Sequence, residues 1–350
     1  MSKAFDTIDH VILLNKLKFY GFDEKSVKLV HSYLSDRFQS VFYNGCFSQY
    51  LEVITGVPQG SILGPTMFIV YINDLPSALN NVCVSSFMYA DDLAIQISCS
   101  NINLVNQIMS HFNSVAEDWT AANGLCLNKD KTQCIKFSLS NSIDVNDVKF
   151  LGVLLQSNIK WEAHIVNVCN KISKGTFMIR RLKQYVTLDV LLSVYYAYIQ
   201  SHLSYGIIVW GCDSNIKKLL ILQKRVLRIM CNASCRTHCK PLFKDLGILT
   251  VTSLYILQLL LYVRINLNVL PTNSSIHDHD TRQRNLLRIR QCNYQATIKS
   301  TYEMGIKIYN MLPREIKCLD DNKFKIKLKS LLIELSIYDV KEFILYCTNC

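Results

Sequence analysis

An acidic pair between two apolar segments constrains the fold of this chain more than any other feature. Residues 82–88 and 93–97 are short β-rich runs, and residues 89–92 (Tyr-Ala-Asp-Asp) separate them. This pattern predicts a β-hairpin with Asp91 and Asp92 at its tip. Carboxylates beside apolar strands are costly unless a cation or a hydrogen-bond donor pairs them. Their oxygen atoms favour Mg²⁺ over softer metal ions. An ordinary acidic turn is the alternative interpretation.

A glycine-flanked turn is the second distinctive segment, at residues 55–60 (Thr-Gly-Val-Pro-Gln-Gly). Its glycines allow the backbone to approach a ligand closely. Pro58 stiffens the turn, and Gln59 offers both a donor and an acceptor. We expect an apolar helix to follow over residues 62–75. Such a turn at the start of a helix suits a base pair or a sugar, with a plain surface turn as the competing interpretation.

Charge is divided unevenly along the chain. Residues 1–155 carry 10 Lys/Arg against 14 Asp/Glu, a net charge of −4, and the remainder carries 28 against 13, a net charge of +15. An acidic first part is suited to cations, and a basic second part is suited to a polyanion. A solvated basic surface is the plainer explanation for the second part.

The apolar pattern predicts mostly helical structure, as the low content of glycine (12) and proline (6) also indicates. Helices are expected over residues 11–43 and 102–122, a strand-like pair at 132–137 and 148–155, and almost wholly helical structure from about residue 160. The change in charge and periodicity places a domain boundary near residues 155–160.

Cysteine usage and the N-terminal sequence indicate an intracellular protein with reduced thiols. The 14 cysteines are irregularly spaced, and no apolar signal segment precedes them. The apolar run at residues 246–263 predicts a buried core helix rather than a membrane span. Zinc binding stays open as an alternative to plain thiols at residues 231–239 and at Cys347 and Cys350.

Two further segments are basic, and the second of them, residues 323–329, is a candidate RNA contact. Residues 278–290 combine Asp, His and Arg side chains and predict a basic loop. Lysines alternate with apolar residues over 323–329, which is typical of a strand or of the basic edge of a helix.

Five segments together resemble the motifs of one enzyme family, in that family's order and spacing. Residues 2–10 are similar to the end of motif A of reverse transcriptases, residues 56–65 to motif B, 89–92 to motif C, 123–132 to motif D and 150–153 to motif E, the primer grip. These motifs, and residues 201–206 with the following Trp210-Gly211, resemble non-LTR (LINE-type) retrotransposons of the Jockey-like group. The resemblance covers nearly the whole chain and is sharpest up to about residue 155.

The resemblance implies an α+β fold with three parts. A reverse transcriptase palm, with an antiparallel sheet and helices, would occupy residues 1–155, a helical thumb 156–235 and a basic, mostly helical C-terminal domain 236–350. The implied activity is RNA-directed DNA polymerisation, in which two metal ions assist nucleotidyl transfer to a primer 3′-OH. Mg²⁺ is the implied cofactor, with Mn²⁺ as an alternative. The implied partners are an RNA template, a DNA primer or target and dNTPs, with access to the nucleus and no membrane.

Individual roles follow from the same resemblance. Asp91 would be the main metal ligand, and Asp92 its weaker neighbour. Phe5 matches the steric gate that excludes a ribonucleotide 2′-OH. Nucleotide contacts would come from Gln59, Gly60 and Lys131, and the primer grip from Phe150, Leu151 and Gly152. Phosphate contacts along the duplex would come from Lys171, Lys174, Arg180, Arg181, Lys224, Arg225 and Arg228.

One catalytic position of the family falls outside this sequence. The first metal-binding aspartate of motif A precedes the Ala-Phe pair by four residues, and Ala4 places that position just ahead of Met1. The fingers segment would also lie upstream. Losing one carboxylate from a two-metal site costs many powers of ten in rate. We therefore expect the isolated chain to be a poor or inactive polymerase, and robust primer extension on poly(A) with dTTP and Mg²⁺ would contradict this. A non-catalytic nucleic-acid-binding remnant of the same element is the alternative function.

Overall fold

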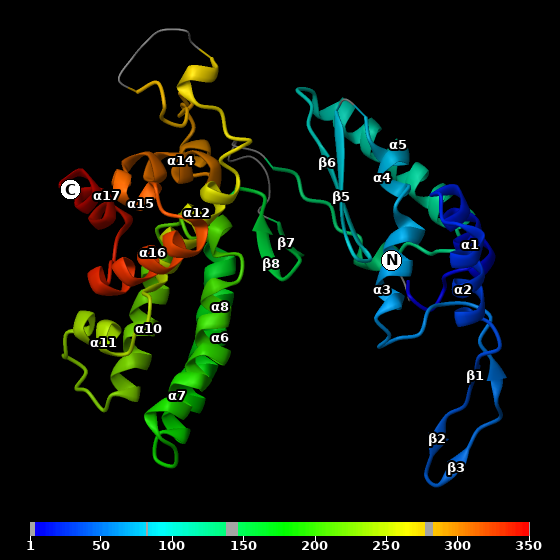
Figure 1. The fold of residues 1–350 in the computed structure, drawn as a ribbon, viewed down its shortest axis with the longest axis horizontal. Coiled ribbons are helices and arrows are strands. Elements are labelled where there is room, and N and C mark those ends of the chain that lie inside the picture. Colours follow the sequence, from blue (N-terminus) through cyan, green and yellow to red (C-terminus); the bar gives the residue numbers. More distant parts are fainter. Residues whose placement is uncertain (1–3, 82, 138–145, 277–282, 350) are drawn as a thin grey trace. The chain divides into compact units, whose positions relative to one another are not determined.

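The computed structural model describes residues 4–81, 83–137, 146–276 and 283–349. The chain divides into two units, Met1–Gln133 and Cys134–Cys350 (Figure 1). The regular secondary structure of the described residues consists of helices and two-stranded antiparallel ladders, which confirms the predicted α+β class. No helix within the described residues is long and apolar enough to cross a membrane.

Two aspartate-capped helices open the first unit. Helix α1 (His10–Phe19) starts where the Asp9 side chain accepts a hydrogen bond from the Ile12 N–H, and Asp23 caps α2 (Glu24–Leu34) in the same way. The predicted helix over residues 11–43 is therefore interrupted, and it is wrong beyond Leu34. There the chain turns through Asp36, which has a φ of 55°, and enters extended structure.

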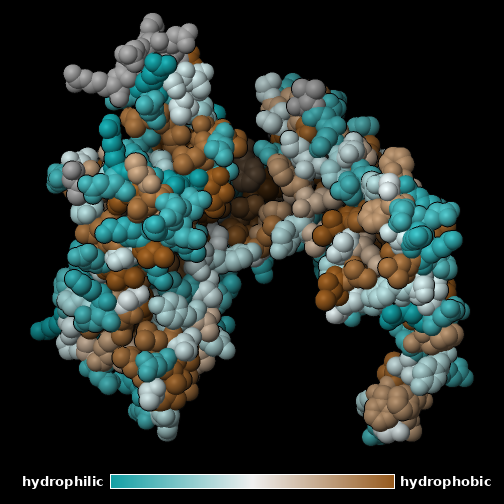
Figure 2. Space-filling model, viewed as in Figure 1, coloured by the Kyte–Doolittle hydropathy of each residue, from teal (hydrophilic) through white to brown (hydrophobic). Residues whose placement is uncertain are grey.

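A narrow β-arm follows α2 and projects from the first unit (Figure 1). Strand β1 (Phe38–Gln39) pairs with β4 (Leu51–Glu52), and β2 (Phe42–Tyr43) pairs with β3 (Cys46–Phe47). The Asn44-Gly45 turn has positive φ at both residues, as a type I′ hairpin requires. Its strands expose large apolar side chains, and Figure 2 shows apolar colour at the arm's end. The sequence did not predict this arm, because its ladders are only two residues long.

The predicted acidic hairpin is confirmed in the first unit. Strands β5 (Val84–Tyr89) and β6 (Asp92–Ile97) pair antiparallel over their full length. Helices α4 (Leu75–Leu79) and α5 (Ile102–Ala122) cover the ladder, and α5 spans the predicted residues 102–122. The apolar helix predicted after the turn is α3 (Leu63–Ile72), whose Phe68 and Tyr71 are fully buried.

The strand prediction for residues 132–137 is wrong. A 3-10 turn, η1 (Lys129–Lys131), precedes them, and Thr132 completes that turn by donating to the Asn128 carbonyl. Residues 132–137 are not part of any strand that the structure describes. Residues 148–155 instead supply both sides of one hairpin, β7 (Asp147–Phe150) and β8 (Val153–Gln156). Residues 148–150 thus pair with residues 153–155 across a tight turn, and not with residues 132–137.

Helices build the second unit around one central, buried helix, α12 (Val251–Ile265), which confirms the core-helix prediction for the apolar run. Ten residues of α12 are buried. Helices α8, α9, α10, α14 and α16 contact it. The helical elements are α6 (Glu162–Leu182), α7 (Leu188–Tyr195), the π-helical turn η2 (Tyr196–Gln200), α8 (Ser201–Ser204), α9 (Ile207–Trp210), α10 (Ile216–Met230), α11 (Cys239–Asp245), η3 (Asn273–Ser275), α13 (Gln295–Ile298), α14 (Thr301–Met311), α15 (Arg314–Lys317), α16 (Asp321–Leu335) and α17 (Val340–Asn349).

The division between the units does not coincide with the predicted boundaries at 155 and 235. It lies ahead of β7, so the β7–β8 hairpin belongs with the helices that follow it. One hydrophobic core then runs from Ile165 to Cys347 without a break at residue 235. The lysine-rich residues 323–329 lie in α16, which selects the helical alternative. Of the predicted basic loop, residues 278–282 lie outside the described residues.

Candidate active site and nucleic-acid interface

The acids of the β5–β6 hairpin lie at a strained turn. Tyr89 pairs with Asp92 at the end of the ladder, which leaves Ala90 and Asp91 as the loop. Ala90 has a φ of 48°, a left-handed conformation that favours glycine. Asp91 is half-buried and Asp92 is exposed. Since Asp91 lies outside the regular strand, the two carboxylates need not alternate between opposite faces as strand neighbours do.

The tip of the β5–β6 hairpin and the glycine-flanked turn adjoin the same hydrophobic cluster. Met88 packs against a cluster of buried side chains that includes Val57 and Phe68. Phe5 packs on the same cluster. Three peptide units join Met88 to Asp91, and at 3.8 Å per unit their Cα atoms lie within about 11 Å of each other. The acids are therefore tethered near the core that also holds Phe5 and the turn.

Backbone hydrogen bonds join motif A to motif B. The Gly56 N–H donates to the Ile8 carbonyl at 2.8 Å, and the Val57 N–H donates to the Phe5 carbonyl at 2.9 Å. Gly56 has a φ of +83°, and a Cβ there would lie 2.8 Å from the Asp6 Cα. Glycine is thus required at this crossing, because any side chain would collide with the facing backbone.

Gln59 is oriented by an aspartate from motif A. Its Nε2 donates to Asp6 Oδ1 at 2.7 Å, although both side chains are exposed. The Gln59 amide is therefore positioned before any nucleotide binds. Sequence reasoning named Gln59 but missed this partner, because 53 residues separate the two positions. Gly60 is exposed beside it, with a φ of +82°, and a Cβ at this position would meet no atom within 4 Å.

The predicted steric gate is held by an aromatic contact. The ring of Phe5 lies 4.5 Å from that of Phe68, centroid to centroid, with the planes tilted by 35°. Phe68 is completely buried, whereas Phe5 is half-buried and retains an exposed edge. Such an aromatic pair adds about 0.5–1.5 kcal/mol beyond area burial. Phe5 is thus held against the core by Phe68.

Motif D is fastened to α3 by a buried phenol. The Tyr71 hydroxyl donates to the Asn123 carbonyl at 2.6 Å, and burial raises the pKa of Tyr71. Lys16 from α1 adds an ion pair to Asp74 at 2.6 Å, while burial lowers the pKa of the Lys16 amine. The Tyr71 contact fixes the start of motif D, and Lys131 at its end is exposed.

The predicted primer-grip hairpin lies in the second unit, where residues 201–206 contact it. Leu151 and Gly152 both have positive φ, as a two-residue type I′ turn requires. The Tyr205 hydroxyl donates to the Leu151 carbonyl at 2.5 Å, and a Cβ on Gly152 would meet the Tyr205 ring at 3.4 Å. Phe150 is half-buried on the last position of β7. Residues 201–206 were singled out by resemblance alone, and the structure shows that Tyr205 of this segment contacts the turn at Leu151 and Gly152.

A buried histidine attaches the same hairpin to α6. The Leu154 N–H donates to His164 Nδ1 at 3.2 Å, so this nitrogen must be unprotonated. Burial, with a smaller contribution from Lys171, lowers the pKa of His164. The imidazole ring also lies 5.4 Å from the ring of Trp210. Nothing in the sequence pattern singled out His164, since its partner is a backbone amide.

These motifs match a known family. Residues 1–155 fit the family model described as "Reverse transcriptase (RNA-dependent DNA polymerase)". The similarity to reverse transcriptases therefore covers residues 1–155, which are less than half of the chain. The match covers motifs A to E, including the β5–β6 acids and the β7–β8 turn.

Proteins similar to this chain come from insect transposons. It is 25% identical to the probable RNA-directed DNA polymerase from transposon X-element of Drosophila melanogaster, over 71% of this chain and 29% of that protein. It is 24% identical to the RNA-directed DNA polymerase from mobile element jockey of Drosophila funebris, with the same coverage. A transposon BS protein of Drosophila melanogaster is 26% identical, over 72% of this chain and 30% of its own length. The chain thus spans less than a third of these relatives, and the similarity continues beyond the family match.

The predicted phosphate-binding cations of this chain occupy different environments. On α6 all four cations are exposed, and Lys171, Lys174 and Arg181 fall within about 80° of one another around the helix, whereas Arg180 is nine residues from Lys171 and about 180° around the helix. On α10, Arg225 is exposed, and Arg228 donates to the Thr237 carbonyl at 3.0 and 2.9 Å. The structure therefore does not bring all seven cations onto one face.

Lys224 also has a local partner. Its ammonium lies 3.4 Å from the centroid of the Tyr338 ring, and burial lowers the pKa of its amine. This cation–π contact holds the Lys224 side chain against Tyr338, between α16 and α17, rather than leaving it extended into solvent.

Within the part of the chain that the structure describes, no group of three or more His, Cys, Asp or Glu side chains is arranged to hold a metal ion. The described residues of the 231–239 segment therefore form no such zinc cluster.

Proposed function

We propose that this chain is the palm and thumb portion of an RNA-directed DNA polymerase of the non-LTR retrotransposon type. The observation that carries the proposal is the shared core of the first unit. Met88 beside the acidic tip, Val57 in the turn and Phe5 in motif A all pack on it. A nucleotide held by the turn would thus lie beside the acids. The substrates would be dNTPs, with an RNA template, a DNA primer or target, and access to the nucleus where target DNA lies.

The donor set at the hairpin suits a hard divalent cation. Asp91 and Asp92 offer carboxylate oxygens at an accessible turn, and such ligands suit Mg²⁺ or Mn²⁺. A bound cation would neutralise the dNTP phosphates and increase the acidity of the primer 3′-OH. Asp91 is the principal ligand in this proposal, and Asp92 supports it. The rigid two-residue loop fixes where these carboxylates can reach.

The remaining nucleotide contacts come from residues that are already oriented. Gln59, held by Asp6, presents its amide to the incoming nucleotide or its template partner, and Gly60 leaves room for the approach. Phe5, stacked on Phe68, blocks a 2′-OH. Lys131, exposed at the end of motif D, neutralises the departing pyrophosphate. These residues distinguish nucleotides by pairing and by sugar.

The second unit is proposed to hold the primer–template duplex. Phe150, Leu151 and Gly152 form the turn that would lie against the primer backbone. The exposed cations Lys171, Lys174, Arg181 and Arg225 would contact phosphates without reading sequence. Local partners hold Lys224 and Arg228, and Arg180 lies in another direction around α6. These three cations would add to the positive electrostatic field around the duplex rather than contact its phosphates in one row.

Template-directed nucleotide selection tests the proposal without requiring turnover. The chain is mixed with poly(rA) and an oligo(dT) primer that ends in a dideoxynucleotide, and retention of labelled dTTP or dGTP is measured in Mg²⁺. We expect dTTP to be retained over dGTP, and Asp91→Asn to lose about tenfold or more in affinity, which is about 1.4 kcal/mol. Asp118→Asn is the matched control, because Asp118 is an exposed aspartate on α5. Equal retention of both nucleotides by the unmodified chain would reject the polymerase assignment.

A further inference from the structure

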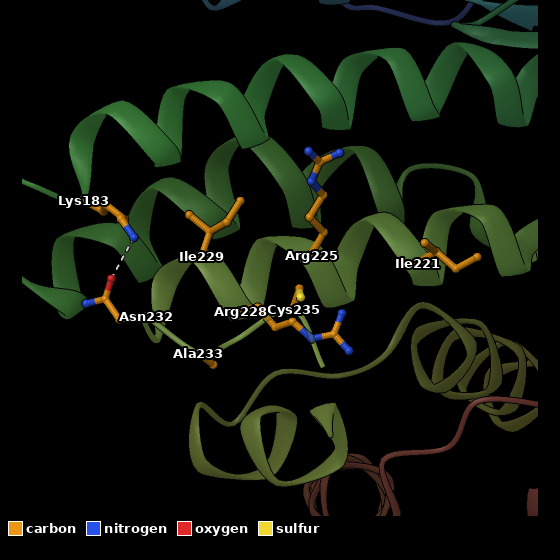
Figure 3. A pocket seen from close by; sticks show the side chains of 8 residues that line it. All are labelled: Lys183, Ile221, Arg225, Arg228, Ile229, Asn232, Ala233 and Cys235. Carbon is orange, nitrogen blue, oxygen red and sulfur yellow. Dashed lines mark hydrogen bonds between the residues drawn. The ribbon is translucent and has the colours of Figure 1, made fainter. Parts of the chain in front are cut away.

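A cavity of about 490 Å³ lies over the C-terminal half of α10 in the second unit (Figure 3). Its size falls within the range of about 300–1,000 Å³ that is typical of small-molecule sites. Among the described residues, no acidic side chain lines it. The lining residues are Lys183, Ile221, Arg225, Arg228, Ile229, Asn232, Ala233 and Cys235.

Two of its cations are fixed by neutral partners. Lys183 Nζ donates to Asn232 Oδ1 at 2.7 Å, and the Arg228 guanidinium donates twice to the Thr237 carbonyl. Amide and carbonyl oxygens orient these groups without cancelling their charge. The cavity therefore offers positive charge at fixed positions, which favours an anionic ligand.

The third cation is available to a ligand. Arg225 is exposed and has no ion-pair partner among the described residues. Figure 3 shows Arg225 and Arg228 on opposite sides of the α10 ribbon, with Lys183 at the end where Asn232 lies. The planar guanidinium of Arg225 is suited to a phosphate, which it can bind through two parallel hydrogen bonds.

The rest of the lining is apolar. Ile221 is 66% exposed at one end of the lining, and Ile229 and Ala233 are half-buried toward the other end (Figure 3). Apolar surface of this kind is available to the flat face of a base, while the flanking cations are available to its phosphate. A simple inorganic anion would use only the charged part of this lining.

We propose that this cavity binds one nucleotide unit, with its phosphate at Arg225, in the positive field of Lys183 and Arg228, and its base against Ile229 and Ala233. The unit is either part of a single strand or a free nucleotide, since the two share this chemistry. The strand form rests on the proposed polymerase function. The cavity would then hold an unpaired nucleotide at a defined place on the second unit.

Filling the cavity separates this site from general electrostatic attraction. Binding of fluorescein-labelled oligo(dT) and of mant-dATP is measured by fluorescence with EDTA present, so that metal-dependent binding at the acids is silent. Ala233→Trp fills the cavity without changing charge, and Val190→Trp adds the same ring to an exposed position on α7. Ile221→Trp is a second filling variant at the exposed rim. Circular dichroism melting identifies any variant that fails to fold.

Charge removal provides the second comparison. Arg225→Ala removes a cation from the lining, and Arg314→Ala removes an exposed cation elsewhere. We expect Ala233→Trp and Ile221→Trp to weaken oligo(dT) binding about tenfold, or about 1.4 kcal/mol. We expect Arg225→Ala to lower the slope of log K against log salt by about 0.7, as for one single-strand phosphate contact. The two control variants should match the unmodified chain closely.

The two ligands identify the source of the nucleotide. Loss of oligo(dT) binding alone assigns the cavity to a strand, and loss of mant-dATP binding as well shows that a free nucleotide enters it. If both folded filling variants bind like the unmodified chain, the cavity proposal is overturned while the polymerase proposal stands. If the unmodified chain binds neither probe, the cavity proposal and the predicted strand contacts of the thumb both fail.

Discussion

At the scale of single residues, the crossing of motif A and motif B makes Gly56 the least replaceable position. Gly56→Ala should destabilise the first unit by about 3 kcal/mol, because the left-handed conformation costs about 1–2 kcal/mol and the Cβ overlaps the Asp6 backbone. Urea unfolding measures the change. Gly60→Ala is the matched control, since Gly60 has nearly the same φ but open space around it. Equal losses in the two variants would show that the two backbones cross less closely than these distances require.

Ala90 leads to the opposite prediction. It holds a positive φ beside Asp91, and a glycine there relieves a cost of about 1–2 kcal/mol. We therefore expect Ala90→Gly to stabilise the β5–β6 hairpin by about 1 kcal/mol, reduced by the greater freedom of glycine in the unfolded chain. Hydrogen exchange of the β5 and β6 amides measures this effect. Slower exchange is expected, and faster exchange would contradict the assigned turn conformation.

The gate residue can be tested through sugar selection. Phe5→Ala should increase UTP retention relative to dTTP by about tenfold, about 1.4 kcal/mol, because the ring next to Phe68 would no longer exclude the 2′-OH. Phe22→Ala is the control, since it removes a ring that is 46% exposed and lies outside motif A. The ratio of UTP to dTTP on the poly(rA) complex is the measurement. An unchanged ratio would remove Phe5 from the nucleotide site.

At the scale of elements, the β7–β8 hairpin should respond to pH through His164. Its pKa is lowered in the folded protein, whereas the unfolded residue takes up a proton near pH 6.5. The stabilisation is therefore fully present above about pH 6.5 and is lost as the pH falls below it. Protonation of Nδ1 would also break the hydrogen bond from Leu154.

We expect the free energy of unfolding of the second unit to fall between about pH 7.5 and about pH 5.5, measured with urea. His164→Gln should flatten this dependence, because glutamine does not titrate. His238→Gln, at an exposed position ahead of α11, should leave it unchanged. A pH profile that His164→Gln does not alter would exclude this histidine as the cause.

Local patterns predicted elements well where the interacting residues are close in sequence. The β5–β6 hairpin, α5 and the buried α12 followed from alternation, helical spacing and an apolar run. The contacts between Gln59 and Asp6, and between Tyr205 and Leu151, span 53 and 54 residues and leave no periodic signal. Residues 132–137 were mispredicted for the related reason that a strand needs a partner, which a single segment does not reveal. The β-arm was not predicted, because its two-residue ladders are too short to produce a recognisable alternation of apolar and polar residues.

At the scale of the whole molecule, each unit has hydrophobic clusters of its own. The large cluster of the second unit runs from Ile165 to Cys347 and includes no described residue before position 134. A chain of residues 134–350 should therefore fold alone. Its cooperative thermal unfolding, followed by circular dichroism, is the measurement.

A shorter chain supplies the control for this division. Residues 156–350 lack the β7–β8 hairpin, which would expose His164 and the Gly152 contact surface of Tyr205. We expect this chain to melt at a lower temperature than residues 134–350. Equal melting temperatures would instead favour a boundary near residue 155 and would assign the hairpin to the palm.

Cation binding at the hairpin tip is the most direct test of the central claim. Mn²⁺ is titrated into the chain with dTTP, and free Mn²⁺ is followed by electron paramagnetic resonance. We predict that Asp91→Asn weakens Mn²⁺ binding about tenfold or more, that Gln59→Ala weakens it less and only when dTTP is present, and that Asp118→Asn has no effect. If Asp91→Asn binds Mn²⁺ and dTTP as tightly as the unmodified chain, the acids of the hairpin do not form the nucleotide site and the account is contradicted.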